Sequence, residues 1–149
     1  MRKLLCIASL IFLPNVAFAC KLGAEATDLE AFLGAKNDSQ VIFLGKVTLV
    51  QELPRTASEI NRDITIETSK WWRGAPQGVV RVFGAEGTMA ETDCAGLFDF
   101  FARVGEQWLV VGTWWNGQIH PSGLLSVRLK KNGKLPAKIK AQLNRISKK

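Results

Sequence analysis

Apolar and polar residues are arranged between residues 40 and 129 as in a succession of β-strands. Gln40 to Leu53 is β-branched and apolar, and Gly45 within it is typical of a bulge or a sharp bend. Residues 62–72 alternate, with Ile64 and Ile66 on one face and polar residues on the other. Shorter apolar runs predict strands at 79–83, 107–115 and 123–129. The pattern therefore predicts five strands.

The segments between these runs read as turns and loops. Asn116-Gly117 has the composition of a tight two-residue hairpin, although residues 119–123 could make that connection longer. Residues 84–96 are glycine-rich and acidic, which predicts a loop, and Asn132-Gly133 predicts a further turn.

A helix is predicted near each end of this strand region. Thr27 and Glu30 have the spacing of a capping box and predict a short helix over residues 28–36, with Thr27 as its cap. Residues 134–149 predict an amphipathic helix with Pro136 in its first turn. The apolar stripe of this helix consists of Leu135, Ile139, Leu143 and Ile146. Because strands and helices do not alternate regularly, we expect a mainly β fold, a small antiparallel barrel with these two helices.

The first 19 residues have the order of a secretory signal peptide. Arg2 and Lys3 precede an apolar run of ten residues, and a small-x-small pattern ends at Ala19. The run is shorter than the roughly 20 residues that span a bilayer. We expect cleavage after Ala19, one domain over residues 20–149, and a periplasmic or secreted location. The alternative is lipidation of Cys20, which would anchor the protein to a membrane.

Cleavage leaves two cysteines, Cys20 and Cys94. In an oxidising compartment two cysteines most simply form one disulfide. Two free thiols or an intermolecular bridge are the alternatives.

Positive charge is concentrated at the C-terminal end. Residues 20–127 hold nine Lys/Arg and thirteen Asp/Glu, whereas residues 128–149 hold nine Lys/Arg and no acid. Such a tail suggests an anionic partner, and export favours a polyanionic glycan, or a protein, over nucleic acid. The alternative is a solvated helix face that keeps the protein soluble. The expected polyanion-binding residues are Arg128, Lys130, Lys131, Lys134, Lys138, Lys140, Arg145, Lys148 and Lys149.

The sequence lacks the usual marks of an enzyme. His120 is the only histidine, which excludes zinc sites built from several histidines, and we expect it to be structural or at the surface. No nucleophile motif or phosphate-binding glycine loop is present. Glu86, Glu91 and Asp93 read as a solvated acidic loop rather than a calcium site. We therefore expect a protein without catalytic activity, cofactor or bound metal.

Two adjacent tryptophan pairs, Trp71-Trp72 and Trp114-Trp115, fall within predicted strands. Neighbouring strand residues point to opposite faces, so one member of each pair should lie in the core. The outward member is either covered by the end helices or free to stack on a base or a sugar.

The order of several short motifs resembles tissue inhibitor of metalloproteinases-like proteins of the netrin-like module group. The motifs are Cys20, residues 40–47 (QVIFLGKV), residues 72–74 (WRG), Cys94 and residues 105–110 (GEQWLV). The resemblance covers most of residues 20–149 and implies an oligonucleotide/oligosaccharide-binding (OB) barrel with flanking helices. It also implies a disulfide between Cys20 and Cys94.

The resemblance adds a second functional hypothesis. In these inhibitors the N-terminal cysteine chelates the zinc of the protease through its free α-amine and carbonyl oxygen, and the next residue enters the protease pocket. Cys20 and Lys21 would occupy these positions. The first expectation is thus an exported, non-enzymatic OB-fold binding module. The alternative is a metalloprotease inhibitor that acts through Cys20.

Overall fold

Six strands and two helices make up the part of the chain that the structure describes. The computed structural model describes residues 27–35, 37–54, 59–87, 99–131 and 133–146. In chain order the elements are α2 (Leu29–Gly34), β1 (Gln40–Glu52), β2 (Glu59–Arg73), β3 (Val79–Gly87), β4 (Gln107–Trp115), β5 (Gln118–Pro121), β6 (Val127–Arg128) and α3 (Ala137–Ile146).

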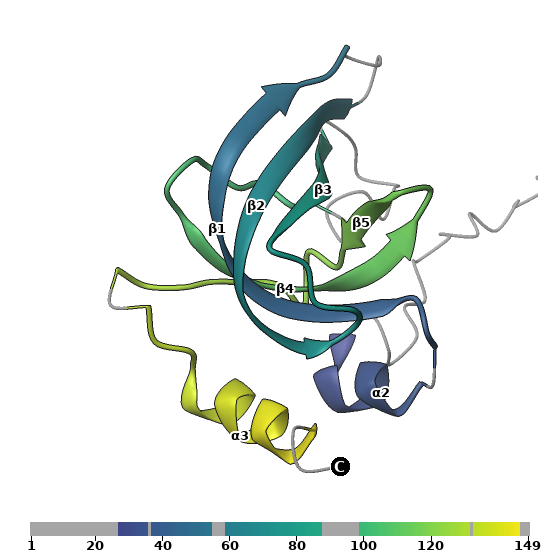
Figure 1. Ribbon diagram of the computed structural model, residues 1–149, viewed down its shortest axis with the longest axis vertical. Helices are drawn as coiled ribbons and strands as arrows, with labels where there is room; N and C mark the ends of the chain where they lie inside the picture. The colour runs from purple at the N-terminus through teal and green to yellow at the C-terminus, as the bar shows by residue number, and fades with distance from the viewer. Residues whose placement is uncertain (1–26, 36, 55–58, 88–98, 132, 147–149) are drawn as a thin grey trace, which may run out of the picture.

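Five of these strands close into a barrel (Figure 1). Neighbours pair in the order β1-β2-β3-β5-β4, and β4 pairs back onto β1. Four of the pairs are antiparallel, and β3–β5 is parallel through Val82 and Ile119. Strand direction cannot alternate all the way round a ring of five, so one parallel pair is unavoidable. The predicted mainly β, five-stranded OB-type barrel with two short helices is confirmed, with this one parallel pair in place of wholly antiparallel pairing.

The predicted bend at Gly45 is present. The β1–β2 register shifts between Leu44 and Gly45, as in a bulge. A Cβ atom at Gly45 would lie 2.4 Å from Cγ2 of Ile66 and 2.7 Å from the carbonyl oxygen of Glu67. Only glycine permits the two strands to approach this closely.

Two apolar clusters hold the fold together. The first fills the barrel and includes Val41, Phe43 and Phe100. The second lies between the barrel and the helices and includes Ile42 and Leu143. Successive β1 residues therefore bury opposite faces in different clusters, which explains the unbroken apolar run at the start of this strand. Figure 1 shows α2 and α3 on the same side of the barrel.

The position of the fifth strand was predicted wrongly. The fifth barrel strand is β5, which follows the Asn116-Gly117 turn directly. Both turn residues have positive φ (48° and 80°), as the tight hairpin signal predicted. Of the predicted strand at 123–129, only β6 is extended, and it pairs with the start of β4. Leu125 and Leu129 in this segment are apolar because they bury in the second cluster.

The predicted loop at 84–96 is also partly corrected. Residues 84–87 continue β3, and they pair with residues 59–62 of β2. Glu86 therefore lies in a strand, where its carboxylate is 3.4 Å from Nη1 of Arg62. Glu91 and Asp93 lie outside the described residues.

The helices differ from prediction in their ends. Asp28, rather than Thr27, caps α2, because its Oδ1 accepts a hydrogen bond of 2.9 Å from the amide of Ala31. The described part of the C-terminal helix is α3, which begins at Ala137, one residue after Pro136. Its predicted stripe is confirmed: Leu143 is buried in the second cluster, and Leu135, Ile139 and Ile146 pack against it.

Both tryptophan pairs divide between two faces as expected. Trp71 and Trp114 pack against the barrel core, and Trp72 packs on the helix-side cluster. Trp115 is different, because 62% of its surface is exposed at the end of β4. Helices therefore cover the outward member of the first pair, whereas the outward member of the second pair is open.

Candidate functional site

An open hollow of about 1140 Å³ lies where the start of β4 meets the segment after β6. We call it the basic groove. Among the described residues, those that line it are Lys46, Val104, Gly105, Glu106, Gln107, Arg128, Leu129, Lys130 and Lys131.

Strand pairing sets the positions of the groove side chains. Lys46 of β1 pairs with Gln107 on one side of β4, and Arg128 of β6 pairs with Trp108 on the other side. The chain after β6 stays on the barrel because the Leu129 amide donates to the Gln107 carbonyl at 2.8 Å. Hydrogen-bonded backbone thus supports the groove, and the long cationic side chains extend from it.

Glu106 is the acidic residue among the described lining residues, and its carboxylate is fully engaged. Oε1 accepts from Nη1 of Arg128 at 3.0 Å. Oε2 accepts from the amide of Arg103 and from Nε1 of Trp108, both at 3.0 Å. Partial burial by itself raises the pKa of Glu106, but these hydrogen bonds and the charge of Arg128 outweigh it and lower the pKa below the usual value.

The groove therefore has a positive balance. Its described lining holds Lys46, Arg128, Lys130 and Lys131 against the single carboxylate of Glu106, a net charge of +3. A smaller hollow beside the Gly45 bulge shares Lys46 and Gln107 with it. The groove thus extends from β6 across the start of β4 to β1, where the smaller hollow adds the carboxylate of Glu67.

The structure brings together three of the nine predicted polyanion-binding residues. Arg128, Lys130 and Lys131 line the groove, as their adjacency in the sequence suggests. Lys46 was not predicted, because it lies some 80 residues earlier in the chain and only the closure of β1 on β4 brings it here.

The other predicted cations lie elsewhere. Lys138 and Lys140 are exposed on α3, and Lys134 precedes that helix. Nη2 of Arg145 is 2.5 Å from Oε1 of Glu30, an ion pair that links α3 to α2. Lys148 and Lys149 lie outside the described residues.

The predicted disulfide and the inhibitor hypothesis rest on Cys20, Lys21 and Cys94, which also lie outside the described residues. Both stay predictions.

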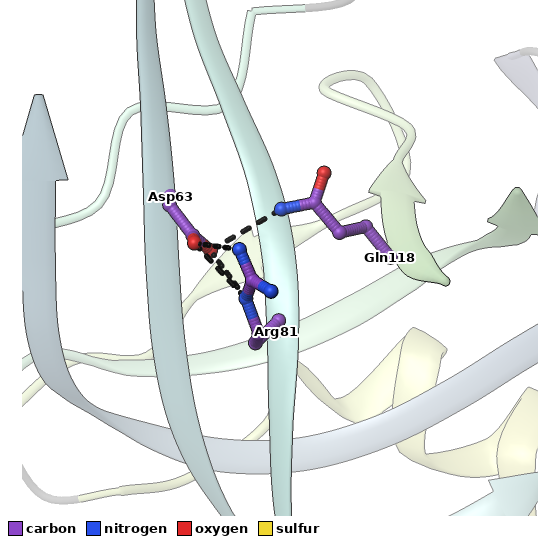
Figure 2. Close-up of polar contacts among 3 residues, drawn as sticks. All are labelled: Asp63, Arg81 and Gln118. Atoms are coloured by element: carbon purple, nitrogen blue, oxygen red, sulfur yellow. Dashed lines mark hydrogen bonds and ion pairs between the residues drawn. The ribbon is translucent and has the colours of Figure 1, made fainter. Parts of the chain in front are cut away.

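A second polar centre lies on the outer surface of β2, β3 and β5 (Figure 2). The carboxylate of Asp63 accepts from Nε and Nη2 of Arg81 and, at 3.3 Å, from Nε2 of Gln118. The Asp63 side chain is 11% exposed and that of Arg81 is 63% exposed. This bonding raises the pKa of Arg81, and the bonds from Nε and Nη2 to the carboxylate orient the guanidinium plane. Nothing in the sequence marked these three residues as a group.

A third polar hollow, beside the turn after β2, is occupied by structural bonds. Arg73 donates to Oε1 of Gln40 and, at 3.1 Å, to the carbonyl of Leu33. Gln40 is buried and donates from Nε2 to the Phe32 carbonyl at 2.6 Å. These bonds fasten α2 to the barrel, so we do not favour this hollow as a binding site.

Within the described ranges, no three His, Cys, Asp or Glu side chains gather where they could hold a metal ion. None of the helices described here has the length and apolarity needed to cross a membrane. No model of a known protein family matches the chain, and no curated protein matches it at a significant level.

Proposed function

We propose that this protein is an exported, non-enzymatic binding module whose basic groove binds a polyanionic glycan. The observation that carries the proposal is the convergence of Lys46, Arg128, Lys130 and Lys131 on one open groove. Cations from β1 and from the segment that follows β4 meet there, on an open hollow rather than in a closed cavity.

The groove suits a flexible chain of repeated negative charges. Sulfate or carboxylate groups along a glycan can each approach a lysine or arginine without a deep pocket. Glu106 supports this arrangement, because its bond to Arg128 holds that side chain beside the groove while the three lysines supply the surplus charge.

The sequence supports a glycan over a nucleic acid. The predicted signal peptide would direct the protein out of the cytoplasm. Outside the cytoplasm, extended polyanions are mainly glycans. A binding module also agrees with the nature of the groove residues, which are cationic or uncharged apart from Glu106.

The test is retention on immobilised heparin, a sulfated glycan, during a salt gradient. The variant Lys130→Glu/Lys131→Glu should elute at clearly lower salt than the unaltered protein. Lys138→Glu/Lys140→Glu is the matched control, because it changes net charge equally but on α3, away from the groove lining. An equal shift in both variants would show that net charge alone governs retention, and would refute the groove.

A further inference from the structure

A patch on the outer surface of the barrel combines polar and aromatic side chains from four adjacent strands. Three polar residues supply hydrogen-bonding groups and three rings supply flat surface. The patch, here called the aromatic patch, consists of Asp63 of β2, Arg81 and Phe83 of β3, Gln118 and His120 of β5, and Trp115 of β4.

The polar half of the patch is organised before any ligand arrives. Asp63 holds Arg81 through Nε and Nη2, and holds Gln118 through Nε2. Figure 2 shows the side-chain oxygen of Gln118 pointing away from Asp63, and one terminal nitrogen of Arg81 without a bond to the residues drawn. Arg81 therefore offers a donor and Gln118 an acceptor, the two kinds of group that a sugar hydroxyl can bond to, since it both donates and accepts.

The aromatic half is fixed by contacts between its rings. His120 stacks on Phe83 with ring centroids 5.0 Å apart, and meets Trp115 edge to face at 5.0 Å. Burial lowers the pKa of His120, which favours the uncharged form of this ring. Trp115 contacts His120, while most of its own surface faces solvent.

Strand order places half-buried members of the patch between its two exposed members. β5 lies between β3 and β4, so Gln118 and His120 are flanked by Arg81 on one side and by Trp115 on the other. Arg81 and Trp115 are the exposed members, and the residues between them are half-buried. The two flanking strands are about 10 Å apart, twice the usual strand spacing.

The charge of the patch selects against a polyanion. Asp63 compensates Arg81, and Gln118, His120, Phe83 and Trp115 are neutral, so the patch has no net charge. A nucleic-acid strand or an acidic glycan needs uncompensated cations along its path. An uncharged ligand with a flat apolar face and many hydroxyls is the complementary partner.

We propose that the aromatic patch binds an uncharged carbohydrate chain, with one sugar ring stacked on Trp115 and its hydroxyls bonded to Arg81 and Gln118. This site goes beyond the glycan proposed for the basic groove and does not depend on it. Trp115 ends β4 and Gln107 begins it, so the two sites are separated by up to about 27 Å of strand.

The test is a titration followed by intrinsic tryptophan fluorescence and by calorimetry. The probes are three uncharged hexasaccharides: β-1,4-linked glucose, α-1,4-linked glucose and β-1,4-linked N-acetylglucosamine. At least one should give a saturable signal that persists in 0.5 M salt. The signal should be lost in Trp115→Ala, at least partly kept in Trp115→Phe, and weakened several-fold in Arg81→Lys.

Two controls separate this site from other causes. Leu49→Ala removes an exposed apolar side chain from β1, outside the patch, and should bind normally. Lys130→Glu/Lys131→Glu should also bind normally, even though its heparin retention falls. The proposal is overturned if all three hexasaccharides fail to bind at millimolar concentration, or if Trp115→Ala binds as well as the unaltered protein. Binding confined to charged glycans and abolished by salt would equally overturn it.

Discussion

The two ends of β4 carry surfaces of opposite character. At its start, the basic groove presents long cationic side chains that rise from paired backbone, and Glu106 restrains only one of them directly. At its end, the aromatic patch presents side chains that are bonded or stacked on one another. The groove depends on charge and tolerates movement, whereas the patch depends on shape and on fixed hydrogen-bond directions.

The two surfaces should therefore differ in the substitutions that they accept. A groove of flexible cations should tolerate exchange of one cation for another and should respond to salt. In a patch whose side chains hold one another in place, ligand binding should not depend on salt concentration. Substitution of a single side chain should be enough to abolish it.

The largest effect should come from removing the shared acceptor of the patch. Asp63→Ala takes away the carboxylate that Arg81 and Gln118 both contact, at a nearly buried position. We expect a loss of about 2 kcal/mol in the free energy of unfolding, measured by urea denaturation. Lys131→Ala in the groove should cost less than about 0.5 kcal/mol. An equal loss of unfolding free energy in the two variants would contradict the difference between a patch of mutually bonded side chains and an open groove.

A second prediction concerns Lys46, the groove cation that was not predicted from the sequence. Lys46→Glu reverses a charge on β1, far in sequence from the basic tail but in the same lining. We expect heparin affinity to fall about tenfold, since each cation near a polyanionic surface contributes about 1 kcal/mol. Trp115→Ala, measured on the same heparin surface, should bind unchanged. Unaltered affinity in Lys46→Glu would limit the binding site to the tail.

A third prediction concerns exchange of arginine and lysine in the patch and in the groove. Arg81→Lys keeps the charge but loses the planar fork that contacts Asp63 through two nitrogens, and should lower the melting temperature. Lys130→Arg should change neither the melting temperature nor the retention on heparin. A melting temperature of Arg81→Lys equal to that of the unaltered protein would contradict a fixed guanidinium.

The smallest effect should come from Glu106. Its pKa is lowered in the folded protein, so its contribution to stability is complete above the pKa of the unfolded chain. That contribution is lost as the pH falls through the lower folded pKa. Glu106→Gln should therefore be less stable by less than about 1 kcal/mol at pH 7, and the two proteins should converge in stability as the pH falls through the lowered pKa of Glu106. A constant difference across this pH range would exclude the ionised carboxylate as the cause.

The barrel was predictable where the strands are long and buried on at least one face. Residues 40–53 and 107–115 read as strands because their side chains fill two clusters at once. β5 was missed because it has only four residues, two of them His120 and Pro121, and no apolar run marks it. The apolar segment at 123–129 misled the prediction because its leucines bury against α3 without forming a full strand.

The sites were predictable only where their residues are close in sequence. The cations at 128–131 stand together, and the sequence alone drew attention to them. Lys46 joins them by barrel closure, and Asp63, Arg81 and Gln118 meet only through pairing of three strands. Of the aromatic patch, the sequence suggested only the outward tryptophan of the second pair, because register across strands cannot be read from one strand alone.

The function proposed for the basic groove, binding of a polyanionic glycan through its cations, makes a quantitative prediction about salt. The most direct test measures heparin affinity between 50 and 500 mM salt for the unaltered protein and for Lys130→Glu/Lys131→Glu. We predict that the logarithm of affinity falls linearly with the logarithm of salt concentration, with a slope of about −3 for four groove cations and a shallower slope for the variant. An affinity that does not change with salt, or the same slope in both proteins, would contradict the account.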